Sequence, residues 1–366
     1  PMYGPDATSL YADFVLAEFR RRGYTVHAIV YDNTDRRPQS KQWDHVYNLE
    51  SQSGRFGKTR DDGCGSSHDD IDDWAGDDLA LFAASLAAAV PFEICICNYV
   101  FMSRVFEVQC PSTHKILLTI DVFAGRNAKI LKTYGNDTGF FFSTSKKGEC
   151  KGLSRADTIV AIQAEEGEYF SALCPDTDVT VLPMVPEPRY FDQDPSSPIR
   201  VGYIASEHRP NVDAIERFIR ELKPESGVSL GIAGSICREL RKLELPSHVQ
   251  LEGRVEDLGV FYERCDLIIN PDMLKSGMKV KCVEALSYGR PLVCTAAAST
   301  GIGLEADYHN AGSTAEVAEW VSKAVRDPAI LVEMASESRR KFDAFRQSYS
   351  VERFADDMIS KAAARD

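Results

Sequence analysis

Apolar runs alternate with amphipathic stretches along most of the 366-residue chain. Such alternation is typical of parallel strands joined by helical crossovers. In the first half, the pattern predicts helices over 9–23, 79–90 and 163–173, and strands over 24–32, 92–97, 115–121, 158–162 and 179–185. The first half therefore predicts one α/β domain built around a buried parallel sheet.

Four prolines within residues 186–200 interrupt this pattern and indicate a linker. A second alternating series follows. Its predicted strands cover 200–205, 228–234, 249–253, 266–270 and 291–295, and its predicted helices cover 211–222, 236–243, 257–265 and 275–289, before two C-terminal helices. Two such series predict two doubly wound parallel sheets with a ligand cleft between the domains.

The start of the chain departs from this scheme. A helix over 9–23 is expected to pack behind a strand that precedes it, and no such strand is present in the sequence. We therefore expect the first strand of the N-terminal sheet to lie upstream of Pro1.

Residues 33–78 form a long polar segment rich in Asp, Ser and Gly, with His68 among several aspartates. A long polar segment of this kind usually forms a solvated loop. We expect the part around 50–75 to be mobile and to supply no metal ligands.

The formal net charge of -13 argues against a general nucleic-acid-binding protein. It leaves room for a local phosphate site, because the amino end of a helix provides positive potential whatever the net charge. No apolar run is long enough to span a membrane, and ten cysteines are scattered mainly through apolar segments, as reduced thiols are in cytosolic proteins. We therefore predict a cytoplasmic protein with no transmembrane segment and no nucleic-acid partner, and leave peripheral membrane association through a substrate open.

Residues 275–293, KSGMKVKCVEALSYGRPLV, combine features that a packing helix does not require. Gly277 lowers helix propensity at the expected helix start and frees the backbone. Gly277 and Met278 follow the strand DLIIN, where amide groups of a new helix could meet a phosphate and Lys279 would add charge. Glu284 could accept hydrogen bonds from paired hydroxyls, as a ribose presents. On spacing alone, an ordinary amphipathic helix with a solvated Glu284 explains the stretch equally well.

The stretch resembles the donor-binding segment of the family-4 retaining glycosyltransferases. That segment has a Gly-rich turn, Lys-x-Lys, and then Glu-Ala-(Leu/Met)-x-x-Gly-x-Pro-(Leu/Val)-Val, which Gly277 to Val293 match. The resemblance continues through GRVEDLGVFYERCDLIINP (253–271) and VGYIASEHRPNVDAI (201–215). In the first half it rests on NYVFMS, DVFAGR and KGLSRADTIVAIQ, and near the end on VERFADDM.

This resemblance implies the GT-B fold, with two Rossmann-like domains facing a central cleft. The expected domains are an acceptor-side domain over 1–190, a nucleotide-sugar-binding domain over 191–345, and a C-terminal helix over 346–366 that crosses back to the first domain. The implied reaction moves a sugar from a nucleotide-sugar donor to a glycan, lipid-linked or small-molecule acceptor, with retained configuration, in glycan or polysaccharide biosynthesis.

The resemblance also implies roles for particular residues. Arg209 and Lys279 would act in catalysis by balancing phosphate charge. The donor-binding set would be Ser206, Arg254, Val255, Ser276, Gly277, Met278, Lys279 and Glu284. The acceptor-side candidates at strand ends are Tyr99, Asp121 and Arg126, for which local caps and turns are an equally good explanation. No cofactor or metal is implied, since cationic side chains and a helix dipole can balance the diphosphate charge.

Three positions depart from the pattern that family-4 enzymes often show. Ser276 stands where many members have Glu, and Ile120 where many have His. The loop that usually carries Arg and Lys has only Arg209, beside His208. These departures keep open a non-catalytic nucleotide-sugar-binding protein of the same fold. A second alternative is a sugar-nucleotide epimerase, which would need acid and base groups around the cleft and is weakened by Ile120.

Overall fold

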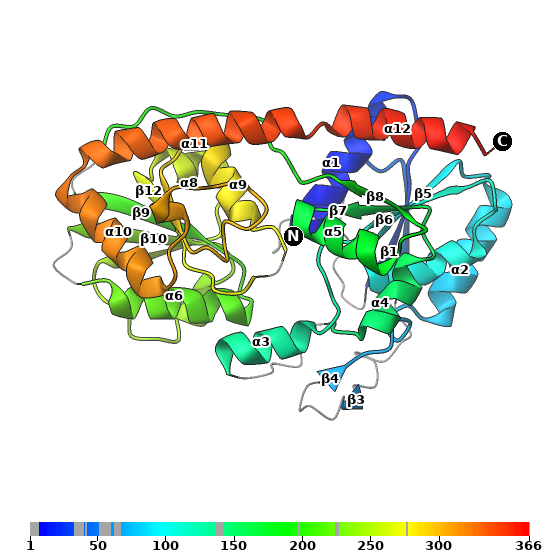
Figure 1. Cartoon of the computed structure of the whole chain (residues 1–366), viewed down its shortest axis with the longest axis horizontal. Coiled ribbons are helices and arrows are strands. Elements are labelled where there is room, and N and C mark those ends of the chain that lie inside the picture. Colours follow the sequence, from blue (N-terminus) through cyan, green and yellow to red (C-terminus); the bar gives the residue numbers. More distant parts are fainter. Residues whose placement is uncertain are drawn as a thin grey trace. The chain divides into compact units, whose positions relative to one another are not determined.

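The computed structural model describes residues 7–32, 40, 42–50, 60–61, 67–135, 142–195, 198–223, 227–275 and 277–365 (Figure 1). The chain divides into two compact units. The N-terminal unit comprises Pro1–Leu131, Asp137–Met184 and Tyr349–Asp366, and the C-terminal unit comprises Lys132–Asn136 and Val185–Ser348. Each unit is a layered α/β structure, which confirms the predicted fold class.

The N-terminal unit is built on four parallel strands in the order β5-β6-β7-β8. Their bounds are β5 Ile94–Asn98, β6 His114–Leu118, β7 Thr158–Ala161 and β8 Asp178–Val181. Alternate residues along β6 enter different cores, because side chains of a strand point to opposite faces. Ile116 and Leu118 pack with helices α1 and α12, whereas Leu117 packs with helices α4 and α5 and the 3₁₀-helix η1. Burial on both faces explains why the centre of β6, Ile116 to Leu118, is a continuous apolar run.

The helices of this unit are α1 Ala7–Arg21, α2 Asp77–Ala89, η1 Val100–Val108, α4 Lys146–Leu153, α5 Ala164–Leu173 and α12 Val351–Ala363, and α3 Arg126–Tyr134 spans the boundary between the units. Although α12 is the last helix of the chain, it packs against α1, the first. Arg22 donates to Asp356 across this contact, with 2.7 Å between Nε and Oδ1.

One prediction for the first half is wrong. Residues 33–78 were expected to be loop, yet β2 His45–Glu50 pairs in parallel with β1 His27–Asp32. HVYNLE alternates only over Tyr47 to Glu50, and the polar composition around it concealed this strand. Short strands β3 Arg60–Asp61 and β4 Ser67–His68 also pair. Of the expected mobile loop, 51–59 and 62–66 lie outside the described residues. At its end, Asp69, Ile71 and Ala75 are buried, so this part is packed and not solvated. The strand expected upstream of Pro1 would lie outside this chain and stays a prediction.

The C-terminal unit has five parallel strands in the order β11-β10-β9-β12-β13. Their bounds are β9 Ile199–Ile204, β10 Val228–Ala233, β11 Val249–Gly253, β12 Leu267–Asn270 and β13 Leu292–Cys294. In sequence order this is 3-2-1-4-5, so the strand order reverses between β9 and β12. In open α/β sheets, ligands bind beyond the carboxyl ends of the strands at such a reversal.

The helices of this unit are α6 Arg209–Glu221, α7 Cys237–Leu240, α8 Leu258–Glu263, α9 Val280–Ser287, η2 Asp307–His309, α10 Thr314–Arg326 and α11 Ala329–Ser348. Residues of α6, α7 and α10 pack into one core with Val201 and Tyr203 of β9. Gly202, on the opposite face of β9, lies against Phe261 and Cys265. Helices α10, α11 and α12 follow β13, and Pro328 lies at the break between α10 and α11.

No helix in the described part of the chain is long and apolar enough to cross a membrane.

Candidate functional site

The candidate donor site lies at the strand reversal of the C-terminal unit. The segment after β9 carries Ser206 and leads into α6, and the segment 271–279 after β12 leads into α9. Because β9 and β12 are adjacent and parallel, both segments leave the same edge of the sheet. The fold therefore brings together two of the sequence stretches that were singled out for donor binding.

Helix α9 begins later than the sequence predicted. It starts at Val280, so Lys279 is its N-cap, whereas Gly277 precedes it in the left-handed region with φ 57°. Met278 is buried at 9% exposure, and Ser276 lies outside the described residues. Gly277 is therefore needed for a turn ahead of the helix, since a residue with a Cβ is strained at this φ.

The end of α9 follows from local sequence. Gly289 has φ 65°, and its N–H donates to the carbonyl of Leu286 at 2.9 Å. The N–H of Arg290 donates to the carbonyl of Ala285 at 3.0 Å. These are the two bonds of a Schellman motif, which explains why a Gly at this position precedes strand β13.

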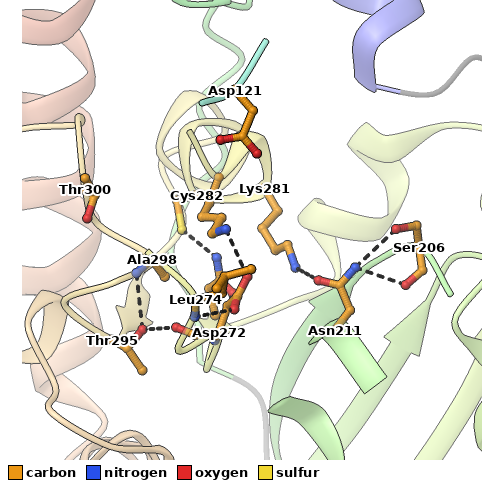
Figure 2. A network of polar contacts seen from close by, with 12 residues as sticks. Asp121, Ser206, Asn211, Asp272, Leu274, Lys281, Cys282, Thr295, Ala298 and Thr300 are labelled. Carbon is orange, nitrogen blue, oxygen red and sulfur yellow. Dashed lines mark hydrogen bonds and ion pairs between the residues drawn. The ribbon is translucent and has the colours of Figure 1, made fainter. Parts of the chain in front are cut away.

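Asp272 organises the segment that leads into α9 (Figure 2). Its carboxylate Oδ1 accepts from the N–H of Leu274 at 2.9 Å, and its carbonyl accepts from the hydroxyl of Thr295. Its Oδ2 lies 3.2 Å from Nζ of Lys279, and the two side chains are 5% and 13% exposed. A buried carboxylate thus holds Lys279 beside the left-handed turn. The sequence analysis missed Asp272, although an Asp two residues beyond a buried strand is a recognisable turn signal.

Lys281 links the two segments at the strand reversal. Its Nζ donates to Oδ1 of Asn211 at 2.9 Å and lies 4.8 Å from the centroid of the Tyr203 ring. Asn211 donates in turn to the carbonyl and hydroxyl oxygens of Ser206, both at 3.1 Å (Figure 2). Burial of the ammonium group lowers the pKa of Lys281 to about 8, with the neighbouring charge of Lys279 acting in the same direction. Lys281 is charged at neutral pH but close to its titration.

Glu284 is placed by an aromatic stack. Its Oε2 accepts from the hydroxyl of Tyr262 at 2.9 Å, and the Tyr262 ring stacks on Tyr288 with 4.6 Å between centroids. Tyr288 in turn stacks on Phe191. Burial raises the pKa of Glu284 to about 7, although the bond from Tyr262 and the charge of Lys281 oppose the shift. No hydrogen bond to Oε1 is found within the described residues, so that oxygen is able to accept one from a ligand.

Three other predicted donor residues, Arg209, Arg254 and Val255, follow the carboxyl ends of strands β9 and β11. Arg209, 52% exposed, pairs with Asp213 on its own helix at 2.6 Å. No hydrogen bond or ion pair connects it to α9 in the described part of the chain. Arg254 is exposed and Val255 is half-buried, both directly after β11. Their predicted roles stay predictions.

Two acceptor-side candidates, Tyr99 and Asp121, follow strands β5 and β6 of the N-terminal unit, whereas Arg126 is the first residue of α3. Tyr99 and Ile120 both have positive φ, 70° and 69°, directly after β5 and close after β6. Such values are rare for residues with a Cβ and costly for a branched one, and they often mark functional sites. Asp121 is buried, and its Oδ2 lies 3.2 Å from Arg126. Strained backbone thus presents Tyr99 and Asp121 at one edge of the sheet.

Two buried glutamates support this edge, and the sequence analysis missed both. Glu149 accepts from the N–H of Phe123 at 2.6 Å and from the hydroxyl of Tyr169 at 2.9 Å. Glu166 accepts from Gln163 at 2.8 Å through Oε1, whereas its Oε2 has no hydrogen-bond partner among the described residues. Burial, followed by the negative charge of Asp121, raises the pKa of Glu166 to about 8. Charged residues within a helical pattern are usually solvated, so only the fold reveals these two as buried.

The described residues contain no group of three or more His, Cys, Asp or Glu side chains placed to hold a metal ion. His68 and its neighbouring aspartates form no such group there.

Comparison with known proteins identifies the class of domain. Residues 198–327 match the family model described as glycosyl transferases group 1. No curated protein matches the chain by sequence. The matched residues are therefore similar to a group 1 glycosyltransferase domain, and they include Asn211, Asp272, Lys279, Lys281 and Glu284 of the candidate donor site.

Solved structures show that the likeness in fold extends over both units. Sucrose-phosphate synthase from Thermosynechococcus elongatus has a TM-score of 0.74 at 11% identity, covering 98% of this chain and 94% of that one. Anabaena Alr3699/HepE in complex with UDP-glucose has a TM-score of 0.64 at 12% identity, covering 99% and 97%. S. aureus TarM, in a complex that includes UDP, has a TM-score of 0.61 at 15% identity, covering 77% and 59%. The chain has the GT-B fold, as the sequence resemblance implied.

Proposed function

We propose that this protein is a retaining glycosyltransferase that transfers a sugar from a UDP-sugar to a hydroxyl of a glycan, lipid-linked or small-molecule acceptor. The observation that carries the proposal is the arrangement at the strand reversal of the C-terminal unit. A left-handed turn at Gly277, two lysine ammonium groups and the Glu284 carboxylate are all placed by one loop and the helix that follows it. The UDP complexes of HepE and TarM support the choice of nucleotide.

Each residue then has a defined task. The diphosphate would lie at the amino end of α9, where Lys279 and Lys281 offset its charge together with the helix dipole. Oε1 of Glu284 would accept hydrogen bonds from ribose hydroxyls, with Oε2 held by Tyr262. Arg254 and Val255 would lie along the base, and Ser206 and Arg209 would approach the phosphates from the segment after β9.

The chemistry that this arrangement favours is departure of the nucleoside diphosphate. As the bond between the sugar and the phosphate oxygen breaks, negative charge grows on the diphosphate and positive charge on the anomeric carbon. Preorganised cations at the diphosphate stabilise this transition state more than the ground state. Two lysines beside a helix terminus can supply that charge, so we propose that transfer does not require a metal ion.

The acceptor would bind to the N-terminal unit. Tyr99, Asp121 and Arg126 lie at the carboxyl ends of its strands, and the positive φ at Tyr99 and Ile120 marks this edge as strained. A carboxylate such as Asp121 can orient a hydroxyl and take up its proton as the new bond forms. We propose on this basis a role in glycan or polysaccharide biosynthesis.

The test is titration and turnover with UDP-glucose. Calorimetry measures binding of uridine, UDP and UDP-glucose, and NMR follows the sugar released to acceptor or water, with and without a chelator. The proposal expects binding, release of UDP, and a first product of retained anomeric configuration. Binding without UDP release would favour the non-catalytic alternative. Conversion of the donor into another UDP-sugar would favour the epimerase, and loss of turnover on chelation would contradict metal independence.

A further inference from the structure

Two cysteines of the N-terminal unit face each other at short range. Sγ of Cys150, on α4, lies 3.6 Å from Sγ of Cys174, at the end of α5. The two residues are 24 positions apart in sequence, so the contact is made by packing of the two helices. Disulfide sulfurs lie about 2.05 Å apart, so a small side-chain movement would bring these atoms to bonding distance.

The pair is accessible from solvent. A cavity of about 570 Å³ is lined by Cys150, Cys174 and the neighbouring Ser154. Cys150 is half-buried, whereas Cys174 is buried at 4% exposure. The pair is unlike Cys282 and Cys294, which are both fully buried. An oxidant entering the cavity would therefore meet Cys150 first, with Cys174 directly behind it.

The side chain of Ser154 and the degree of burial influence how readily each of the two thiols ionises. The hydroxyl oxygen of Ser154 lies 3.7 Å from Sγ of Cys174 and 3.9 Å from Sγ of Cys150, and its proton is donated to the carbonyl of Cys150 at 2.8 Å. If it turned toward either sulfur, this hydroxyl would stabilise a thiolate there. Burial nevertheless raises the pKa of Cys174 to about 11. Attack by the Cys174 sulfur on a disulfide should therefore be slow at neutral pH and faster in alkali, because the thiolate is the attacking form.

We propose that Cys150 and Cys174 form a reversible intramolecular disulfide by exchange with a low-molecular-weight disulfide such as oxidised glutathione. The Cys150 thiolate attacks one sulfur of the oxidant, which forms a mixed disulfide and releases one glutathione thiolate. The Cys174 thiolate then attacks Sγ of Cys150 and releases the second. In sum, two protein thiols are oxidised by two electrons, two glutathione thiols are formed, and two protons pass to these products.

The bond would join helices that also hold the acceptor-side edge. Glu149, next to Cys150 on α4, accepts from Tyr169 of α5 and from the backbone of Phe123, two residues after Asp121. The disulfide would link α4 to α5 covalently, in addition to the hydrogen bond between Tyr169 and Glu149. Because the bridge closes a loop of 24 positions, it should raise the midpoint of thermal unfolding by roughly 5 °C.

The test treats the whole chain with oxidised glutathione at neutral and alkaline pH, blocks free thiols by alkylation, and maps peptides by mass spectrometry. The expected product is a Cys150–Cys174 cross-linked peptide, formed faster in alkali and removed by dithiothreitol. Cys110→Ser, which removes an exposed thiol, should still form it, whereas Cys150→Ser and Cys174→Ser should not. The unfolding midpoint of the oxidised wild type should rise and return on reduction.

A second probe needs no variant. Phenylarsine oxide bridges close thiol pairs, so it should link Cys150 to Cys174 and protect both from alkylation. The proposal is overturned if both thiols are alkylated after treatment that oxidises Cys110, or if Cys150 stops at the mixed disulfide with glutathione. Donor binding by the oxidised protein, titrated separately, tests the proposed function independently of this disulfide.

Discussion

The ammonium group of Lys279 lies 3.2 Å from Oδ2 of Asp272, and both side chains are largely buried. The carboxylate that holds the lysine also accepts from the backbone of Leu274 and so shapes the loop ahead of α9. Lys279 is therefore a structural partner of a buried anion as well as the cation that we propose for the donor diphosphate.

Lys279→Ala should therefore have two separable effects. Loss of a charged contact should weaken UDP binding by about 2 kcal/mol, roughly 30-fold, with little effect on uridine. Leaving Asp272 buried without this partner should also lower the free energy of unfolding by about 3 kcal/mol. Calorimetry and urea unfolding measure the two effects. Lys275→Ala, which removes the same charge from an exposed position nearby, should show neither loss. Equal effects of Lys279→Ala and Lys275→Ala would contradict the proposed roles of Lys279 in diphosphate binding and in pairing with Asp272.

Donor affinity should pass through a maximum between pH values of about 7 and about 8. Below the range, protonation of Glu284, whose pKa is raised to about 7, removes the carboxylate that we propose to accept from ribose. Above it, Lys281, whose pKa is lowered to about 8, loses the charge that we propose to face the diphosphate. Titration of UDP-glucose across this pH range measures the curve. A flat profile in the wild type would show that neither group faces the ligand.

Two substitutions should separate the acid side from the alkaline side of this pH profile of donor affinity. Glu284→Gln removes the titration on the acid side and exchanges a charged hydrogen bond for a neutral one, so affinity at neutral pH should fall by about 1–2 kcal/mol. Lys281→Arg keeps its charge at alkaline pH and should abolish the decline there. If the Glu284→Gln variant kept the same decline in affinity on the acid side, a group other than Glu284 would cause that decline.

Gly277→Val should damage donor binding more than its strain alone explains. Gly277 has φ 57°, so any side chain adds strain, and a branched one would also stand where the diphosphate is proposed to approach. Gly303, with φ 73° and no atom within 4 Å of an added Cβ, provides the matched control. Both valine variants should lose stability, as measured by thermal unfolding, but only Gly277→Val should lose affinity for UDP. If both variants lost affinity for UDP to a similar extent, the loss in Gly277→Val would be an effect of impaired folding and not of a blocked diphosphate site.

Glu166→Gln should stabilise the N-terminal unit at alkaline pH. Because the folded-state pKa of Glu166 is raised to about 8, its contribution to stability is present below its unfolded pKa and is lost as pH rises through about 8. Glutamine cannot ionise, so urea unfolding above that pH should show a gain of about 2 kcal/mol over the wild type, and none in acid. Glu165→Gln, at an exposed neighbouring position, is the control. A gain that did not depend on pH would have another cause.

The amino-acid sequence by itself determined most of the architecture. Buried parallel strands read as apolar runs such as VSLGIA and DLIIN, because both faces of each sheet are covered, and the helices between them keep a regular polar face. The end of α9 was also readable, since Gly289 at that position predicts the left-handed cap observed. The strand β2 was not readable, because a half-exposed edge pair needs few apolar residues.

The residues of the candidate site also fall into those that local sequence reveals and those that only the tertiary structure reveals. Gly277, Lys279 and Glu284 were recognisable because their spacing along one segment is local. Asp272, Asn211, Lys281 and Tyr262 became site residues only in the tertiary structure, which brings separate segments to one edge of the sheet. The same holds for Glu149 and Glu166, and for Cys150 beside Cys174. Their burial and proximity depend on contacts between residues far apart in sequence, and no local pattern encodes the resulting shifts in pKa or the distance between two sulfurs.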